Sequence, residues 1–340
     1  MMKKNRLKRN SLRILFLVLP MITAIFCMTA GRFSLSVGEI FQQIAIFFTQ
    51  GKESMNPQYY SVIFNLRLPR ILLAALCGAG LAVSGAAYQN LFSNPLATPD
   101  TLGVAAGASF GAVLGLLFNQ NLFIVQILSI IFGLLAVTLT YFISGQKNGR
   151  SLIMIVLGGM VVSSIFNALI SLVKFTADAE EQLPSITYWL MGSFASANYK
   201  SLLLCVPFIL VGTFILLLLR WRLNVLCLSE DEAKAQGVSL GTLRVVVSVA
   251  ATIITASCVS MCGQVGWIGL LIPHICRMLF GSNTKKVIPA SLSLGAVFML
   301  CIDAAARSAT AVEIPISILT ALIGAPFFII LLRKTGGAQI

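Results

Sequence analysis

The sequence predicts an all-α membrane protein that crosses the bilayer about ten times. Of its 340 residues, 58% are hydrophobic and only 10% are charged, and the mean hydropathy is +0.93. Soluble proteins usually have about 25% charged residues. So little charge cannot keep the surface of a soluble protein hydrated, so most of this surface must face lipid. The apolar residues also form runs of about 20, the length of helix that crosses a hydrocarbon core of roughly 30 Å.

Ten segments have the length and composition of membrane spans. They are 11–30, 70–90, 99–118, 121–143, 151–173, 201–220, 242–263, 268–280, 286–303 and 314–332. The first resembles a signal peptide, but its apolar run exceeds the usual 7 to 15 residues, so we interpret it as an uncleaved span. Segment 268–280 is short and contains Pro273, and 99–118 is rich in glycine. Residues 36–50 are amphipathic and more polar, and we predict that they lie in the membrane interface.

Basic residues in the loops predict the orientation, because cytoplasmic loops carry an excess of Lys and Arg. With the N-terminus in the cytoplasm and the spans alternating, the whole formal charge of +13 falls on the inner side and the outer side is neutral. An even number of spans places both termini in the cytoplasm. We expect one transmembrane domain over 1–340, with cytoplasmic tails at 1–10 and 333–340 and a cytoplasmic loop at 228–244.

Three arginines fall on the outer side, where this charge rule does not favour them. Arg67 and Arg70 flank Pro69 at the start of the second span, and Arg307 follows the ninth. Each could extend its side chain towards lipid phosphates. Three of them near span ends are better explained as a docking surface for a soluble acidic partner.

Glycines recur every four residues at the start of the third span. Gly103, Gly107, Gly111 and Gly115 therefore share one helix face. A stripe of small residues lets another helix approach closely, and it can also form the smooth wall of a translocation path. The pattern is compatible with both roles.

The loop before this span combines amides with prolines at the predicted inner face. Gln89, Asn90 and Asn94 lie where a gate could close the path, and Asp100 is a candidate cap for the third helix.

The loop 228–244 contains signals for a short helix. Ser229 and Glu232 have the spacing of a capping box. Glu230 and Asp231 suit the positive end of a helix dipole. Gly237 supplies the left-handed residue that ends a helix, and a second short helix is expected near Ser239. Because nothing hydrophobic requires two short helices here, we interpret the loop as a docking element for a cytoplasmic partner.

The sequence lacks the motifs that several other classes of protein require. There is no phosphate-binding G-x-x-x-x-G-K-[ST] motif, no catalytic motif, and no C-x-x-C pair among the eight cysteines. His274 is the only histidine, so a multi-histidine metal site is excluded, and we predict no metal, no cofactor and no enzymatic activity. Asp303 and Glu313 lie at outer span ends, whereas an ion-driven carrier usually needs ionisable groups near mid-membrane. Energy for transport must then come from another chain.

Four stretches carry a resemblance to a known family. They are RLPRILLAALCGAGLAVSGAAYQNLFSNPLATPDTLGVAAGASFGA, EDEAKAQGVSLGTLR, GQVGWIGLLIPHICRMLFG and DAAARSATAVEIPISILTALIGAPFFIILLRK. With these, nearly the whole chain resembles the permease subunits of type II ABC importers, which take up iron chelates, haem and vitamin B12. The resemblance implies a ten-helix permease in the bacterial inner membrane. It also implies a homodimer, or a heterodimer with a related permease, whose path follows the dimer axis.

The resemblance further implies partners and their contact residues. Two ATPase subunits would supply ATP hydrolysis, and an extracytoplasmic substrate-binding protein would place glutamates on Arg67, Arg70 and Arg307. The expected ATPase-coupling residues are Ser229, Glu230, Asp231, Glu232, Ala233, Ala235, Gln236, Gly237 and Val238.

Iron chelates dominate the family, so the substrate predicted is a ferric siderophore, with haem and cobalamin as alternatives. A stand-alone secondary carrier or channel would need the membrane-buried acid that is missing. An intramembrane enzyme would need catalytic pairs that are also missing.

Overall fold

The computed structural model describes residues 16, 18–31, 33, 35–118, 121–145, 152–228 and 230–335, and these residues form helices and loops with no strand. Within these described residues, six helices are long and apolar enough to cross a membrane, and four shorter apolar helices accompany them. Together they match the ten predicted spans. The all-α fold is thus confirmed.

The helices agree with the predicted spans to within a few residues at most ends. The longer ones are α4 (Leu68–Leu91), α6 (Leu122–Ile143), α7 (Leu152–Thr176), α9 (Tyr199–Leu219), α11 (Leu240–Cys262) and α13 (Thr284–Ser308). The shorter ones are the first helix (Val18–Thr29), α5 (Val104–Phe118), α12 (Ile268–Phe280) and α14 (Ile316–Thr335). The predicted tail 1–10 and residues 336–340 lie outside the described residues.

Shorter elements connect these helices. They are α2 (Val37–Gln50), η1 (Lys52–Ser54), α3 (Pro57–Tyr60), η2 (Ser61–Arg67), η3 (Pro99–Leu102), α8 (Gln182–Leu190), η4 (Arg222–Cys227) and α10 (Glu230–Ala235).

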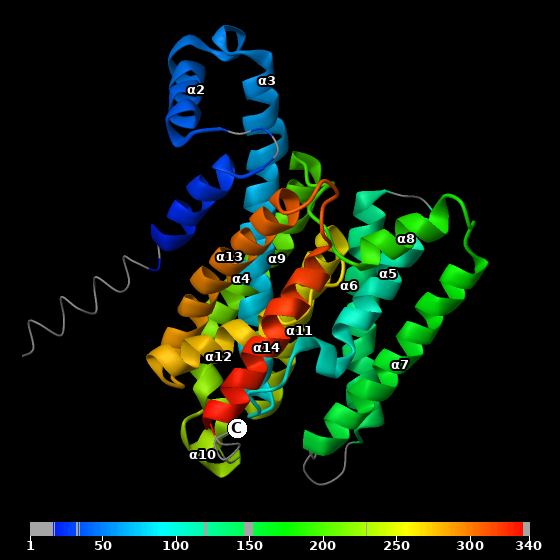
Figure 1. The fold of residues 1–340 in the computed structure, drawn as a ribbon. Helices are drawn as coiled ribbons and strands as arrows, with labels where there is room; N and C mark the ends of the chain where they lie inside the picture. Colours follow the sequence, from blue (N-terminus) through cyan, green and yellow to red (C-terminus); the bar gives the residue numbers. More distant parts are fainter. Residues whose placement is uncertain are drawn as a thin grey trace, which may run out of the picture.

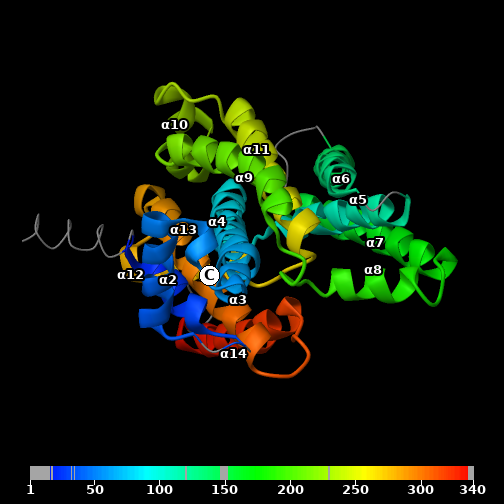
Figure 2. The same cartoon turned by 90° about the horizontal axis from the view of Figure 1, so that it is seen from above.

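The central helix of the bundle is α4. It packs against α9, α11, α12 and α13, while α11 also contacts α5 and α6 and so joins the two sides of the molecule (Figures 1 and 2). In α4 and α11, 78% of the most apolar window is buried inside the chain, against 28–33% in α6, α7 and α9. The chain therefore has its core at α4 and α11, and the surfaces of α6, α7 and α9 are free for lipid or another subunit.

Close contacts in this core depend on glycine. A Cβ built on Gly78 of α4 would overlap the carbonyl oxygen of Gly295 on α13, and the reverse is also true. Because neither residue has a side chain, the two backbones touch directly. Membrane helices have no hydrophobic drive to associate within lipid, so such close backbone packing is a main source of their stability.

The helix that contains α4 continues beyond the bundle. Helix runs without a break from Pro57 to Leu91, 35 residues, which is about 52 Å at 1.5 Å per residue. A hydrocarbon core of roughly 30 Å leaves about 20 Å of this helix outside. With α2 and η1, this extension forms what we call the outer lobe, residues 35–67, at the top of Figure 1.

Aromatic packing places α2 beside this extension. The ring centroids of Phe47 and Phe64 are 4.6 Å apart, those of Tyr60 and Phe64 are 5.3 Å apart, and the Lys52 ammonium lies 4.6 Å from the centre of the Tyr60 ring. The location of residues 36–50 in the membrane interface stays a prediction. The apolar face of α2 is used partly against the aromatic side chains of η2, which the amphipathic pattern of α2 alone could not reveal.

Candidate functional site

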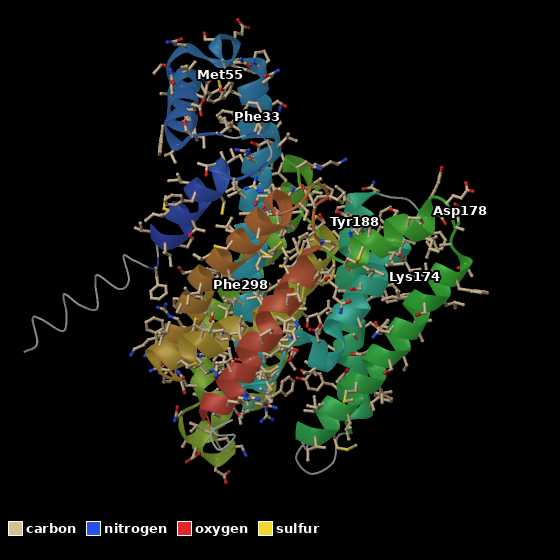
Figure 3. All side chains as sticks on the ribbon, viewed as in Figure 1. Phe33, Met55, Lys174, Asp178, Tyr188 and Phe298 are labelled. Atoms are coloured by element: carbon tan, nitrogen blue, oxygen red, sulfur yellow. The ribbon has the colours of Figure 1, made fainter. Side chains whose placement is uncertain are left out.

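The two predicted docking regions lie at opposite ends of the molecule. Phe33, Met55 and Asp178 lie towards the end that carries the outer lobe, whereas α10 lies at the other end (Figures 1 and 3). The outer lobe and α10 are thus separated by the length of the helix bundle (Figure 1).

At the end that carries the outer lobe, Arg70 is enclosed by two carboxylates of its own chain. Its Nε donates to Asp303 Oδ1 at 2.9 Å. Its Nη1 and Nη2 donate to the two oxygens of Glu313 at 2.8 and 3.0 Å. Two parallel N–H···O bonds of this kind are the strongest geometry available to an Arg–carboxylate pair. Arg70 thus ties α4 to α13 and to the loop that precedes α14.

The other two arginines bind the end of the first helix. Arg307 lies 3.6 Å from Asp303, measured from Nε to Oδ2, and donates from Nη2 to the carbonyl of Cys27. Arg67 donates to the carbonyls of Met28 and Phe33. The last carbonyls of a helix have no partner within the helix and carry a partial negative charge, so guanidinium groups stabilise them.

These three arginines are 5–8% exposed, so we call Arg67, Arg70, Arg307, Asp303 and Glu313 the buried arginine cluster. Docking of a partner's glutamates on the arginines stays a prediction. In this structure each guanidinium group already binds groups of its own chain, although the buried Nε of Arg307 has no hydrogen-bond partner among the described residues. Sequence reasoning missed Asp303 and Glu313 as their partners, although the spacing of Asp303 and Arg307 is that of a helical ion pair.

At the opposite end of the molecule, α10 ends as predicted. Gly237 has φ +70°, its N–H donates to the carbonyl of Lys234 at 2.9 Å, and the N–H of Val238 donates to that of Ala233 at 3.0 Å. This pair of bonds is the Schellman motif. Ala233 and Val238 are buried and fix the short helix to the bundle, whereas Asp231, Ala235 and Gln236 are exposed.

Two details of this loop differ from expectation or stay open. Ser229 lies outside the described residues, and so does its capping box with Glu232. The helix expected near Ser239 is not a second short helix, because it begins at Leu240 and continues as the spanning helix α11 to Cys262. The helix begins at Leu240, two residues before the predicted start of the span at 242.

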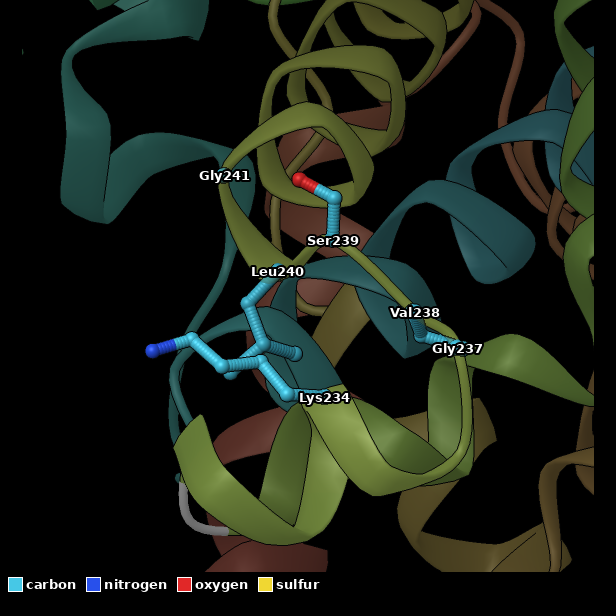
Figure 4. Close-up of a pocket in the computed structure, with 6 residues that line it drawn as sticks. All are labelled: Lys234, Gly237, Val238, Ser239, Leu240 and Gly241. Carbon is cyan, nitrogen blue, oxygen red and sulfur yellow. The ribbon is translucent and has the colours of Figure 1, made fainter.

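A hollow of about 360 Å³ lies between α10 and the start of α11. It is open to solvent and lined by Lys234, Gly237, Val238, Ser239, Leu240 and Gly241 (Figure 4). The described residues that we predicted to couple to an ATPase therefore lie on α10 or directly after it, beside the start of the core helix α11. Their role in coupling to an ATPase stays a prediction.

The predicted gate amides are occupied inside the chain. Gln89 donates to the carbonyls of Gly269 and Leu270 at 3.3 Å and accepts from Arg277. Asn90 donates to the carbonyl of Ala86 at 2.7 Å, one helical turn earlier. The Asn94 side chain accepts from the N–H of Leu96 at 2.9 Å and shapes the turn. A gating role for these residues stays a prediction.

The glycine stripe packs against α6. A Cβ on Gly107 would lie 2.5 Å from the carbonyl oxygen of Phe132, and one on Gly111 would overlap that of Leu128. Gly103 has φ +74° and ends η3 before α5 begins. Helix packing accounts for this stripe, and the wall of a path is not needed to explain it.

The predicted cap at Asp100 is wrong. Thr98 precedes η3, and Asp100 contributes its carbonyl, which accepts from the N–H of Gly103 at 3.0 Å and from the hydroxyl of Ser163 at 3.4 Å. Among the described residues, no group of three or more His, Cys, Asp or Glu side chains could hold a metal ion.

Known proteins match this chain over almost its whole length. The FecCD transport family matches residues 18–334. The molybdate import permease MolB of Haemophilus influenzae is 46% identical over 93% of this chain and 94% of its own. A permease of Helicobacter pylori strain 26695 that is named for iron chelatin transport is 36% identical over 81% of this chain and 83% of its own.

The cobalamin import permease BtuC of Halobacterium salinarum is 35% identical over 80% of this chain and 73% of its own. A solved ABC transporter assigned to the metal-chelate type, in an inward-facing conformation, is 42% identical and superposes with a TM-score of 0.85, covering 96% of this chain and 99% of that one. Ten apolar helices, this superposition and the family match agree. The chain belongs to the FecCD transport family and is an ABC importer permease, a transport subunit and not an enzyme.

Proposed function

We propose that this chain forms the translocation path of a binding-protein-dependent importer. It works as a dimer with a second copy or a related permease, driven by two ATPase subunits and loaded by an extracytoplasmic substrate-binding protein. The observation that carries this proposal is the placement of α10 on the first turn of α11, because a short exposed helix fixed to a core helix can transmit movement of an ATPase. The family match supports the same assignment.

The proposed orientation has the α10 end in the cytoplasm of a bacterium, with the protein in the inner membrane and both termini inside. The excess of Lys and Arg on that side supports it. Cys227 in η4 is exposed at this end, and Ser54 is exposed in the outer lobe. A thiol reagent that cannot cross membranes should label Ser54→Cys from outside intact cells and leave Cys227 unlabelled, and the reverse pattern would invert the topology.

The proposed substrate is a ferric siderophore. Relatives named for iron chelatin or Fe(3+)-citrate transport support it, at 35–36% identity for three of them. Molybdate is a second candidate, favoured by the 46% identity with MolB over 93% of the chain. Both are metal-containing species, and both would be delivered by the binding protein.

The deciding experiment uses purified permease, ATPase and binding protein. Calorimetry first measures which of a ferric siderophore, molybdate, haem or cobalamin the binding protein holds. Uptake of that compound is then measured in proteoliposomes with ATP inside. We expect uptake only when ATP, ATPase and binding protein are all present. Uptake without the ATPase would contradict the proposal and favour a stand-alone carrier.

A further inference from the structure

The carboxylate of Glu313 completes the set of partners around Arg70. Together with Asp303, it engages Nε, Nη1 and Nη2 of the guanidinium group at 2.8–3.0 Å. A carboxylate from another protein therefore has no free N–H fork to bind while Glu313 remains in place. Docking on Arg70, if it occurs, requires that one of these two carboxylates leaves.

Glu313 is the member of the pair that can leave. Its side chain is 26% exposed, whereas that of Asp303 is 1% exposed. Asp303 is also held within α13 and faces Arg307, whereas Glu313 lies in the loop between α13 and α14. Replacing one carboxylate by another keeps the charge of the cluster constant, so no buried arginine is left uncompensated, which would be costly.

The loop that carries Glu313 is connected to the end of α13 and, through the start of α14, to the segment after α8. The N–H of Ile314 donates to Ala306 at 3.1 Å at the end of α13. The N–H groups of Ile316 and Ser317 donate to the carbonyls of Gly192 and Met191 at 2.9 and 3.2 Å, directly after α8. A displacement of Glu313 would thus act on the start of α14 and on the segment that follows α8.

We propose that Glu313 competes with a carboxylate of the substrate-binding protein for binding to Arg70. The partner's carboxylate replaces Glu313 on Arg70, Asp303 stays in place, and the released loop transmits docking to α14 and to the segment after α8. This inference rests on the proposed function, since it assumes that partner. Replacement of Glu313 by the partner's carboxylate explains how a buried arginine can serve as a docking site.

The test compares Glu313→Gln with wild type and with Glu180→Gln. Glutamine keeps the size of the side chain and weakens its hold on Arg70. Glu180 is an exposed acid near α8 that no described side chain pairs with in an ion pair, so its variant controls for the loss of one outer negative charge. Binding of the substrate-binding protein to the permease–ATPase complex in lipid nanodiscs is measured at equilibrium.

If Glu313 competes, Glu313→Gln should bind the partner at least about fivefold more tightly, within the range of typical coupling between sites. Glu180→Gln should bind as wild type does. Unchanged or weaker binding by Glu313→Gln would overturn the inference and leave the pair a purely structural one. If wild type itself neither binds the partner nor hydrolyses ATP faster with it, the proposed function fails, which is a distinct result.

A second measurement uses wild-type protein and does not depend on folding of a variant. Hydrogen exchange of the amides of Ile314, Ile316 and Ser317 is compared with and without the partner. Displacement of Glu313 should speed their exchange. Unchanged or slower hydrogen exchange in the docked complex would contradict the replacement of Glu313 by the partner's carboxylate.

Discussion

Gly85 of α4 faces Gly269 of α12 so closely that a Cβ on Gly85 would overlap the carbonyl oxygen of Gly269. The overlapping atoms belong to backbone, which cannot move aside as a flexible side chain can. This contact fixes the short helix α12 to the central helix.

Gly85→Ala should therefore destabilise the protein by about 1–3 kcal/mol, the usual cost of overpacking. The measurement is thermal unfolding of the purified permease in detergent. Gly266→Ala is the matched control, because a Cβ there would meet nothing within 4 Å. Equal stability of the two variants would show that α12 can shift away from α4.

The glycine stripe on α5 allows a test that distinguishes a role in helix packing from a role in the wall of a translocation path. Gly111→Ala should lower thermal stability by a similar amount, about 1–3 kcal/mol, because its Cβ would overlap Leu128 of α6. Transport per folded molecule should stay close to that of wild type. Normal stability with a changed rate of transport would instead assign Gly111 to the wall of the path.

Substitution of Gly237 tests the proposed coupling of α10 to an ATPase. Proline cannot adopt φ +70°, and it lacks the N–H that donates to Lys234. Gly237→Pro should break the end of α10 and leave ATP hydrolysis uncoupled from uptake in proteoliposomes. Gly241→Ala should behave as wild type, since nothing lies within 4 Å of its Cβ. Retained coupling in Gly237→Pro would argue against the role of α10.

Arg70→Glu tests whether the buried arginine cluster is structural. The new carboxylate would lie against Asp303 and Glu313 with no arginine fork between them. Breaking a buried ion pair costs about 3–5 kcal/mol, so little folded protein should be recovered on size-exclusion chromatography. The double variant of Arg67 and Arg70 to Glu, suggested by a pure docking role, is therefore unsuitable for measuring docking alone. Full recovery of folded Arg70→Glu that no longer responds to the binding protein would support the pure docking role.

The start of α2 gives a test by pH. Glu39 accepts from the N–H of Ser36 at 2.7 Å, and the hydrogen bonds from the Ser36 backbone and hydroxyl lower the pKa of Glu39 below its ordinary 4.5. A lowered pKa in the folded state means that the contribution to stability is present above the ordinary pKa and is lost as pH falls through the lowered one. Amide protection at the start of α2 should then fall at low pH in wild type. In Glu39→Gln the amide oxygen can still accept from the N–H of Ser36 but does not titrate, so protection there should not change with pH. A pH response that persists in this variant would contradict the assignment.

The spans were predictable from sequence because their signal is local. Twenty apolar residues cross the bilayer whatever surrounds them, so α6, α9 and α12 were placed almost to the residue. Likewise Gly237 ends α10 because its conformational freedom is a property of one residue and its neighbours. The extension of α4 was not predicted, because residues 57–67 are more polar and only their continuous helical hydrogen bonding joins them to the span.

The sequence by itself determined the fold class, the number of spans, the distribution of charge and the end of α10, since each depends on composition or on neighbours along the chain. Only the tertiary structure decided what Arg67, Arg70 and Arg307 bind, and that the glycines of α5 face α6. Those contacts join residues far apart in sequence, such as Arg70 and Glu313, and they form because a charge or a bare backbone inside the bundle must find its partner in space.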